Sequence, residues 1–160
     1  MRAILSRRAV MATALVSAVL SSHRDVRAQE LPRQLRAAID GDIRDCMLKK
    51  AAFVTQFISR KDVNRDGVMD YILDYGSYKC GAEASRYCHE AGCRMEVYVS
   101  KGRSGYVQAF SGTVRDLRFG TVNGRPAILL SRHGSACGKA ESAPCRTTLT
   151  WDGTHFAEAR

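Results

Sequence analysis

The sequence predicts an α+β fold, mostly an antiparallel β meander of about seven or eight strands with one N-terminal helix and disulfide staples. Three observations lead to this prediction. Apolar residues recur at helical spacing near residue 35, β-branched and aromatic segments separated by turn residues follow, and the chain contains six cysteines.

The N-terminal segment predicts a secretory signal peptide. Three arginines precede residues 9–20, which carry no charge and are mostly apolar. This stretch is too short to cross a bilayer, which takes about 20 residues. Val26 and Ala28 put small residues at the positions that signal peptidases read, so we expect residues 1–28 to be removed, with a cut near residue 21 as the alternative. The protein is then periplasmic or secreted.

The export route is left open by the same segment. Ser6-Arg7-Arg8 partly resembles a twin-arginine signal, although Val10 and Met11 stand where that family usually has Phe and Leu. The alternative to a cleaved signal is an uncleaved membrane anchor or a helix of the fold. The mature form is expected to have no transmembrane span.

Residues 29–160 are predicted to form one domain, long enough to bury a core. Cleavage removes five arginines and one aspartate, so the net charge falls from +9 to +5. The remaining basic residues are scattered rather than gathered in a stripe with aromatic partners, which argues against nucleic-acid binding. A mildly basic surface leaves weak attraction to an anionic envelope polymer open.

The helix is predicted over residues 32–46. Leu31, Leu35, Ile39 and Ile43 recur at every fourth position and so mark one apolar face. We expect this face to pack on the sheet.

An acidic loop follows, from Asp62 to Asp70. Oxygen-bearing side chains stand at alternate positions at the start of the loop, and a glycine follows the third of them. The predicted calcium ligands are Asp62, Asn64, Asp66, Val68 (through its backbone carbonyl) and Asp70. Position 12 is Leu73 rather than a bidentate glutamate. We therefore expect weak, structural binding, at roughly 10⁻⁴–10⁻³ M as in extracellular modules. The alternative is an empty turn in which the side chains bond their own backbone.

The segments beside this loop predict strands. Residues 53–58 precede it and residues 70–75 follow it, and both are rich in β-branched and aromatic residues. A strand-loop-strand acidic loop that ends in Asp-Tyr-Ile-Leu resembles the calcium loops of the FG-GAP and VCBS repeat families. The resemblance covers residues 62–73 only and occurs once, so it implies the calcium ligands and not the propeller fold of those families. Arg65 stands where their loops often have glycine.

The cysteines predict three disulfides, because their count is even and the domain is exported. They are Cys46, Cys80, Cys88, Cys93, Cys137 and Cys145. Many pairings are possible, and local spacing only gives a preference. Cys88–Cys93 and Cys137–Cys145 each flank a short loop-like segment, which leaves the first two cysteines to link the helix to the sheet.

The cysteines also allow two alternatives to disulfides, a zinc site and a catalytic thiol. Cys88, His89 and Cys93 hint at zinc ligands, but the paired spacing of zinc modules is missing. His133 near Cys137 suggests a catalytic pair, but an even disulfide count leaves no free thiol. Disulfides are the favoured interpretation.

The second half of the chain predicts strands and turns. Strands are expected at residues 94–100, 106–110, 117–122, 127–131, 147–151 and 154–157. Asn123-Gly124 and Asp152-Gly153 each predict a tight two-residue hairpin turn. Trp151 and His155 suggest either a carbohydrate surface or ordinary cross-strand packing, and packing is favoured.

The sequence therefore favours an exported, non-enzymatic binding or structural module with a structural calcium site and an unknown protein or envelope polymer as partner. One alternative is an inhibitor of an envelope-degrading enzyme, for which the positive charge argues against a basic target. A less favoured alternative is a small hydrolase that uses His133 or Asp74. The Ser131–Ser135 segment contains hydroxyl and imidazole groups but lacks the glycine-flanked serine of common hydrolases.

Overall fold

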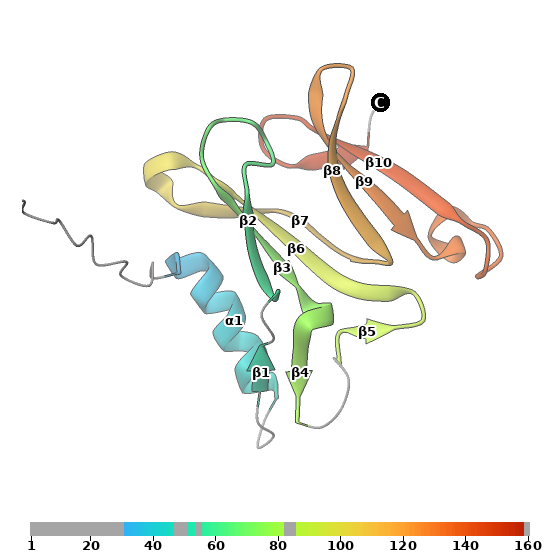
Figure 1. The fold of residues 1–160 in the computed structure, drawn as a ribbon, viewed down its shortest axis with the longest axis horizontal. Helices are drawn as coiled ribbons and strands as arrows, with labels where there is room; N and C mark the ends of the chain where they lie inside the picture. Colours follow the sequence, from blue (N-terminus) through green and yellow to red (C-terminus); the bar gives the residue numbers. More distant parts are fainter. Residues whose placement is uncertain (1–30, 47–50, 54–55, 82–85, 159–160) are drawn as a thin grey trace, which may run out of the picture. The chain divides into compact units, whose positions relative to one another are not determined.

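The computed structural model describes residues 31–46, 51–53, 56–81 and 86–158. These residues form one α-helix and eleven strands, with three disulfides, so the predicted α+β class is confirmed as mainly antiparallel β with one helix (Figure 1). The proposed signal peptide, residues 1–28, lies outside the described residues. No helix in the described part of the chain is long and apolar enough to cross a membrane.

The strands form three antiparallel sheets. The elements are α1 (Arg33–Asp45), β1 (Ala51–Phe53), β2 (Ile58–Lys61), β3 (Asp70–Asp74), β4 (Tyr78–Cys80), β5 (Cys88–His89), β6 (Gly92–Ser100), β7 (Tyr106–Val114), β8 (Asp116–Val122), β9 (Arg125–Arg132), β10 (Cys145–Trp151) and β11 (Phe156–Glu158). The first large sheet has the order β2-β3-β6-β5, with β7 on the other edge of β6. The second sheet is the meander β8-β9-β10-β11, and β1 pairs with β4.

Helix α1 confirms the predicted helix but shifts its buried face. Leu35 and Ile39 are buried as expected, whereas Ile43 is 40% exposed and Asp42 takes the inner position. A helix turns once in 3.6 residues, so a strict four-residue spacing drifts around its surface while the i, i+4, i+7 spacing stays on one face. The prediction that Ile43 belongs to the core was wrong for this reason.

The first large sheet is covered on both faces. Tyr71 and Leu73 of β3 face a core shared with α1, whereas Ile72 between them belongs to a second core. In β6, Val97 and Val99 join that second core with Ile128, Leu130 and Leu149 of the second sheet. A strand that is buried on both faces needs apolar side chains on both, which explains the three consecutive apolar residues at the centre of β3, Tyr71 to Leu73.

One predicted hairpin turn is confirmed and the other is wrong. Asn123 and Gly124 have φ values of 50° and 77°, as a type I′ turn between β8 and β9 requires. The second turn is longer, because Trp151 pairs with Phe156 and four residues lie between them. The Asp152 carboxylate accepts hydrogen bonds from two backbone amides ahead of it, which holds the wider loop.

Two strand predictions also need correction. The single strand over residues 53–58 is wrong, because β1 ends at Phe53, β2 begins at Ile58 and Phe57 lies in a turn with its ring buried. The strand expected over residues 106–110 continues to Val114 in β7. Its second half contains serine and glycine, which seldom favour strands, and is held by pairing with β6 down to Cys93.

Candidate functional site

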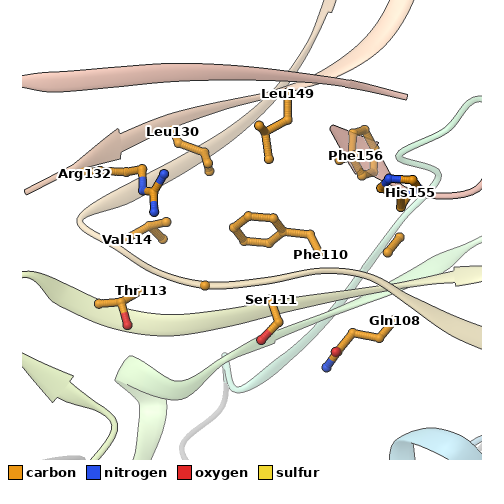
Figure 2. A pocket seen from close by; sticks show the side chains of 12 residues that line it. Gln108, Phe110, Ser111, Thr113, Val114, Leu130, Arg132, Leu149, His155 and Phe156 are labelled. Carbon is orange, nitrogen blue, oxygen red and sulfur yellow. The ribbon is translucent and has the colours of Figure 1, made fainter. Parts of the chain in front are cut away.

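A groove of about 530 Å³ runs between β7 and the second sheet. One wall is a continuous run of β7, residues 108–114. The opposite wall consists of side chains from β9, β10 and the β10–β11 loop with β11, namely Leu130, Arg132, Leu149, His155 and Phe156 (Figure 2). The groove therefore lies where the two sheets diverge.

The β7 wall of the groove is a strand edge rather than a strand face. Seven consecutive residues line the groove, whereas a groove over one face would be lined by every second residue. In the described part of the chain β7 pairs only with β6. The other edge of β7 therefore opens into the groove with its main-chain groups.

The inner lining of the groove is apolar because it belongs to the second core. The Phe110 ring points across the groove toward Leu130 and Leu149 (Figure 2), and Phe156 is buried beside them. Trp151 packs against Phe156 with ring centroids 5.1 Å apart. This cross-strand contact agrees with the packing interpretation of Trp151.

The basic side chains of Arg132 and His155 stand at different places in the groove. The Arg132 guanidinium points inward beside Val114, and His155 lies next to Phe156 (Figure 2). The His155 ring lies 3.1 Å from the Asp152 carboxylate, and the backbone amides of His155 and Thr154 lower the pKa of Asp152 to about 2. Among the described residues Arg132 has no ion pair and no hydrogen bond from its side chain. The groove thus combines an apolar lining with one unpaired cation.

The acidic loop brings three of its predicted ligands together. Asp62 accepts hydrogen bonds from the amides of Asp66 and Gly67, and Asn64 lies within 2.9 Å of the Asp66 carboxylate. Gly67 has a φ of 86°, which only glycine adopts readily. The loop is closed in the way that both a calcium site and an Asx-type turn require. In the described part of the chain no three His, Cys, Asp or Glu side chains are grouped as metal ligands.

Asp70, the last residue of the loop, is turned into the protein. Its side chain is fully buried, and its two oxygens accept from the amides of Val63 and Ser100, each at 2.9 Å. Burial raises the pKa of Asp70, and the nearby charges of Asp66 and Asp62 raise it further, whereas the two amides lower it. A carboxylate oxygen has two lone pairs, so each Asp70 oxygen keeps one beyond its amide bond. Val68, whose carbonyl is a predicted ligand, is an exposed residue of the loop.

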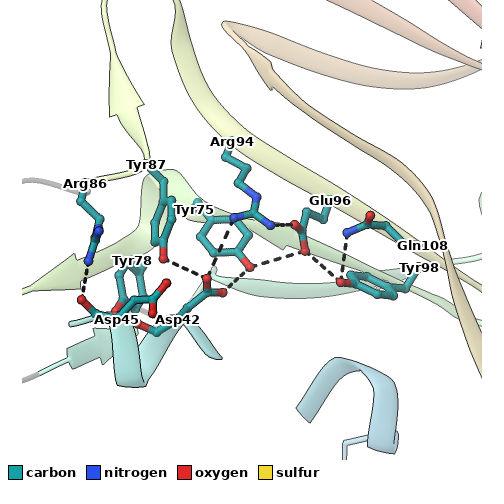
Figure 3. Close-up of polar contacts among 10 residues, drawn as sticks. All are labelled: Asp42, Asp45, Tyr75, Tyr78, Arg86, Tyr87, Arg94, Glu96, Tyr98 and Gln108. Carbon is teal, nitrogen blue, oxygen red and sulfur yellow. Dashed lines mark hydrogen bonds and ion pairs between the residues drawn. The ribbon is translucent and has the colours of Figure 1, made fainter. Parts of the chain in front are cut away.

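Sequence reasoning missed a polar cluster between α1 and the first large sheet (Figure 3). The Tyr75 hydroxyl donates to the Asp42 carboxylate at 2.5 Å and lies 3.4 Å from Glu96. Tyr87 also donates to Asp42, and Tyr98 donates to Glu96 at 3.0 Å. Two buried carboxylates thus share three tyrosine hydroxyls.

Arg94 balances the charge of this cluster. Its guanidinium pairs with Glu96, lies 4.0 Å from Asp42 and stacks 4.9 Å from the centre of the Tyr75 ring. Burial raises the pKa of the Tyr75 hydroxyl well above its usual range, and the bond to Asp42 adds to this. The hydroxyl is therefore a donor and not a base. A structural role follows. Glu96, a charged residue among the apolar residues of β6, was the available sequence signal, whereas the inner position of Asp42 is seen only in the structure.

All six cysteines are paired as the local spacing favoured. The disulfides are Cys46–Cys80, Cys88–Cys93 and Cys137–Cys145. No free thiol is present in the described residues, so neither the zinc nor the catalytic-cysteine alternative has a thiolate to use. Three disulfides fit an extracellular or periplasmic protein.

The residues considered for hydrolysis have local structural partners. The His133 ring lies 2.7 Å from the Ser135 hydroxyl, two residues along the same turn. The Asp74 carboxylate accepts from the Gly76 amide and so caps a 3₁₀ turn. Among the described residues no hydrogen bond joins Asp74 to the His133–Ser135 pair, so these groups do not form a triad.

Comparison with known proteins gives no relative, since no family model, no curated protein and no solved structure matches the chain. The resemblance of residues 62–73 to the FG-GAP and VCBS loops stays a prediction.

Proposed function

We propose that the protein is an exported, non-catalytic binding module, and that the groove beside β7 takes a segment of a partner protein that carries a carboxylate. The observation that carries the proposal is Arg132, a guanidinium without a partner among the described residues, which points into an apolar groove. A guanidinium in such surroundings gains from a carboxylate, because the two planar groups form paired, charge-assisted hydrogen bonds.

Two kinds of contact in the groove contribute to the free energy of binding. A hydrogen bond to a charged group contributes about 1.5–3 kcal/mol. Apolar side chains of the partner that cover the exposed part of Phe110 add about 25 cal/mol per Å² of buried apolar surface. These contributions suit a reversible protein contact rather than a cofactor held permanently.

Catalysis is not part of the proposal, because the described lining offers little to build it from. Its hydroxyls belong to Ser111 and Thr113, and neither makes a hydrogen bond to a described base. Export follows from the predicted signal over residues 1–28, and the disulfides support an oxidising compartment.

The test is a selection of linear random peptides of about ten residues, a length that spans β7 at ~3.3 Å per residue. The oxidised protein is the target, and Trp151, the only tryptophan in the chain, reports binding through its fluorescence because it packs on Phe156. We expect the selected peptides to carry an acidic residue or a free C-terminal carboxylate. Arg132→Ala should weaken them about tenfold to a hundredfold.

Arg146→Ala is the matched control. Arg146 is exposed on β10 and lies outside the groove lining, so the same charge is removed from the opposite face of the sheet. Equal weakening by both substitutions, or equal loss of binding to an anionic polysaccharide, would mean that general surface charge attracts the ligand. A selection that enriches no peptide would contradict the proposal.

We also propose that the acidic loop holds a calcium ion that stabilises the fold. Support comes from the alternation of oxygen ligands, the left-handed Gly67 and the convergence of Asp62, Asn64 and Asp66. A cation would also favour the ionised form of the buried Asp70, whose pKa is raised by burial and then by its acidic neighbours.

A further inference from the structure

We infer that the partner segment binds as an added strand, hydrogen-bonded to the free edge of β7. This inference rests on the proposed function and names the geometry of its ligand. Its first support is the pairing of β7. This nine-residue strand pairs with β6 along one edge, and in the described part of the chain no strand pairs with its other edge. The unpaired amide and carbonyl groups can therefore accept another extended chain.

The sequence of β7 lacks the usual protection of an edge strand. Charged residues and proline commonly prevent edge-to-edge association, and residues 106–114 contain neither. The strand is irregular only opposite Val97 and Tyr98, where the register shifts. From Phe110 to Val114 the pairing with β6 is continuous, so this half of β7 offers a regular edge.

The groove has room where the added strand would lie. Neighbouring strands are about 4.8 Å apart, so a strand paired with β7 would occupy the space beside it. That space is the groove, since its β7 wall is formed by consecutive residues 108–114. A ligand that only covered one face of β7 would not use this wall.

The side chains of the groove specify an alternating ligand. Phe110 and Val114 face the second core, whereas Ser111 and Thr113 pair with Glu96 and Arg94 and share their opposite face. An added strand continues this alternation. Its apolar side chains would lie on the side of the half-buried Phe110 and the second sheet, and its polar side chains would extend the face of Ser111 and Thr113.

Arg132 then fixes the position of the ligand's carboxylate. Its guanidinium lies beside Val114, at the end of β7 (Figure 2). The expected ligand is an extended segment of alternating apolar and polar residues with an acidic group where it passes the Val114 end. The charge places the ligand along the strand, and the main-chain bonds supply a contact that does not depend on side-chain identity.

The experiment uses the tightest peptide from the selection and two N-methylated forms of it. In each form every second backbone amide is methylated, and the two forms methylate opposite sets. An added strand directs one set toward β7 and the other toward solvent, so one form should bind at least about tenfold more weakly while the other binds as the parent peptide does. Amide exchange followed by NMR should slow at alternate residues between Phe110 and Val114 on binding, and elsewhere much less.

The possible failures are distinguishable. If both methylated forms bind like the parent and Arg132→Ala still weakens binding, the groove is a binding site but strand addition is wrong. If the protein instead self-associates through β7, with the same exchange protection appearing at high protein concentration and no peptide added, the partner is a second copy and the inference is overturned. If the selection yields no peptide, the proposed function fails and this inference fails with it.

Discussion

Replacing Tyr75 with phenylalanine tests whether the polar cluster under α1 stabilises the fold. The substitution removes one hydroxyl and keeps the ring, which packs edge-on against Phe57 with centroids 5.3 Å apart. Because the Tyr75 side chain is fully buried, water cannot replace the hydroxyl without a cavity or a rearrangement. The change therefore isolates the hydrogen bonds.

The expected loss follows from the partners that remain. Asp42 would lose its 2.5 Å bond but keep Tyr87, and Glu96 would lose only a 3.4 Å contact and keep Tyr98 and Arg94. One strong bond to a buried charge is lost, which costs about 1.5–3 kcal/mol. We expect Tyr75→Phe to lower the free energy of unfolding by about this amount.

Urea unfolding at neutral pH, with the disulfides intact, measures this difference. Tyr106→Phe is the matched control, because its hydroxyl donates to the neutral carbonyl of Met69 at 3.0 Å in a more exposed position. That bond should contribute about 0.5–1 kcal/mol. The reasoning is refuted if Tyr75→Phe costs no more than Tyr106→Phe, or if it stabilises the protein.

Three further predictions concern pH, calcium and disulfides. Burial raises the pKa of Tyr98 to about 12, whereas tyrosines in an unfolded chain have a pKa of ~10. The neutral hydroxyl therefore contributes stability that is complete below pH ~10 and is lost as the pH rises toward ~12. A free energy of unfolding, measured in urea, that does not change over this pH range would contradict burial of the hydroxyl. Calcium at about 100 times its dissociation constant should add about 2.7 kcal/mol, or roughly 10 °C in melting temperature, and Asp62→Ala with Asp66→Ala should abolish the shift; no heat by calorimetry and no shift at millimolar calcium would leave the loop as a turn. Replacing Cys46 and Cys80 with alanine should cost about 3–4 kcal/mol, against about 2 kcal/mol for the disulfide between β5 and β6, because the first closes a separation of 34 residues and the second one of 5; equal losses in thermal melts would argue against loop closure as the cause.

Sequence patterns correctly predicted the elements whose conformation depends on residues close together in the chain. The amphipathic spacing around Leu35 and Ile39 is a property of the helix itself, and the Asn123-Gly124 turn needs two residues that tolerate positive φ. The disulfide preference also succeeded, because short loops between cysteines close readily. Ile43 was misplaced because a four-residue period approximates 3.6 imperfectly.

The elements that sequence reasoning missed depend on distant partners. Strand β7 extends to Val114 only because β6 pairs with it, and strands β1 and β4 are short segments that stabilise each other across 25 or more positions of chain, as the register of Ala51 with Cys80 shows. The polar cluster likewise joins Asp42 of α1 to Tyr75 and Glu96. Such contacts leave no periodic signal in any one segment.

By itself, the sequence determined the mainly β class, the helix, the acidic loop and the six paired cysteines. Only the tertiary structure decided that the two sheets diverge beside β7, that the edge of this strand opens into the gap, and that Arg132 points there. The physical reason is that a groove is a relation between surfaces. Each residue that lines the groove occupies a regular position in its own strand. The space between the two walls depends on where the two sheets pack together and where that packing ends.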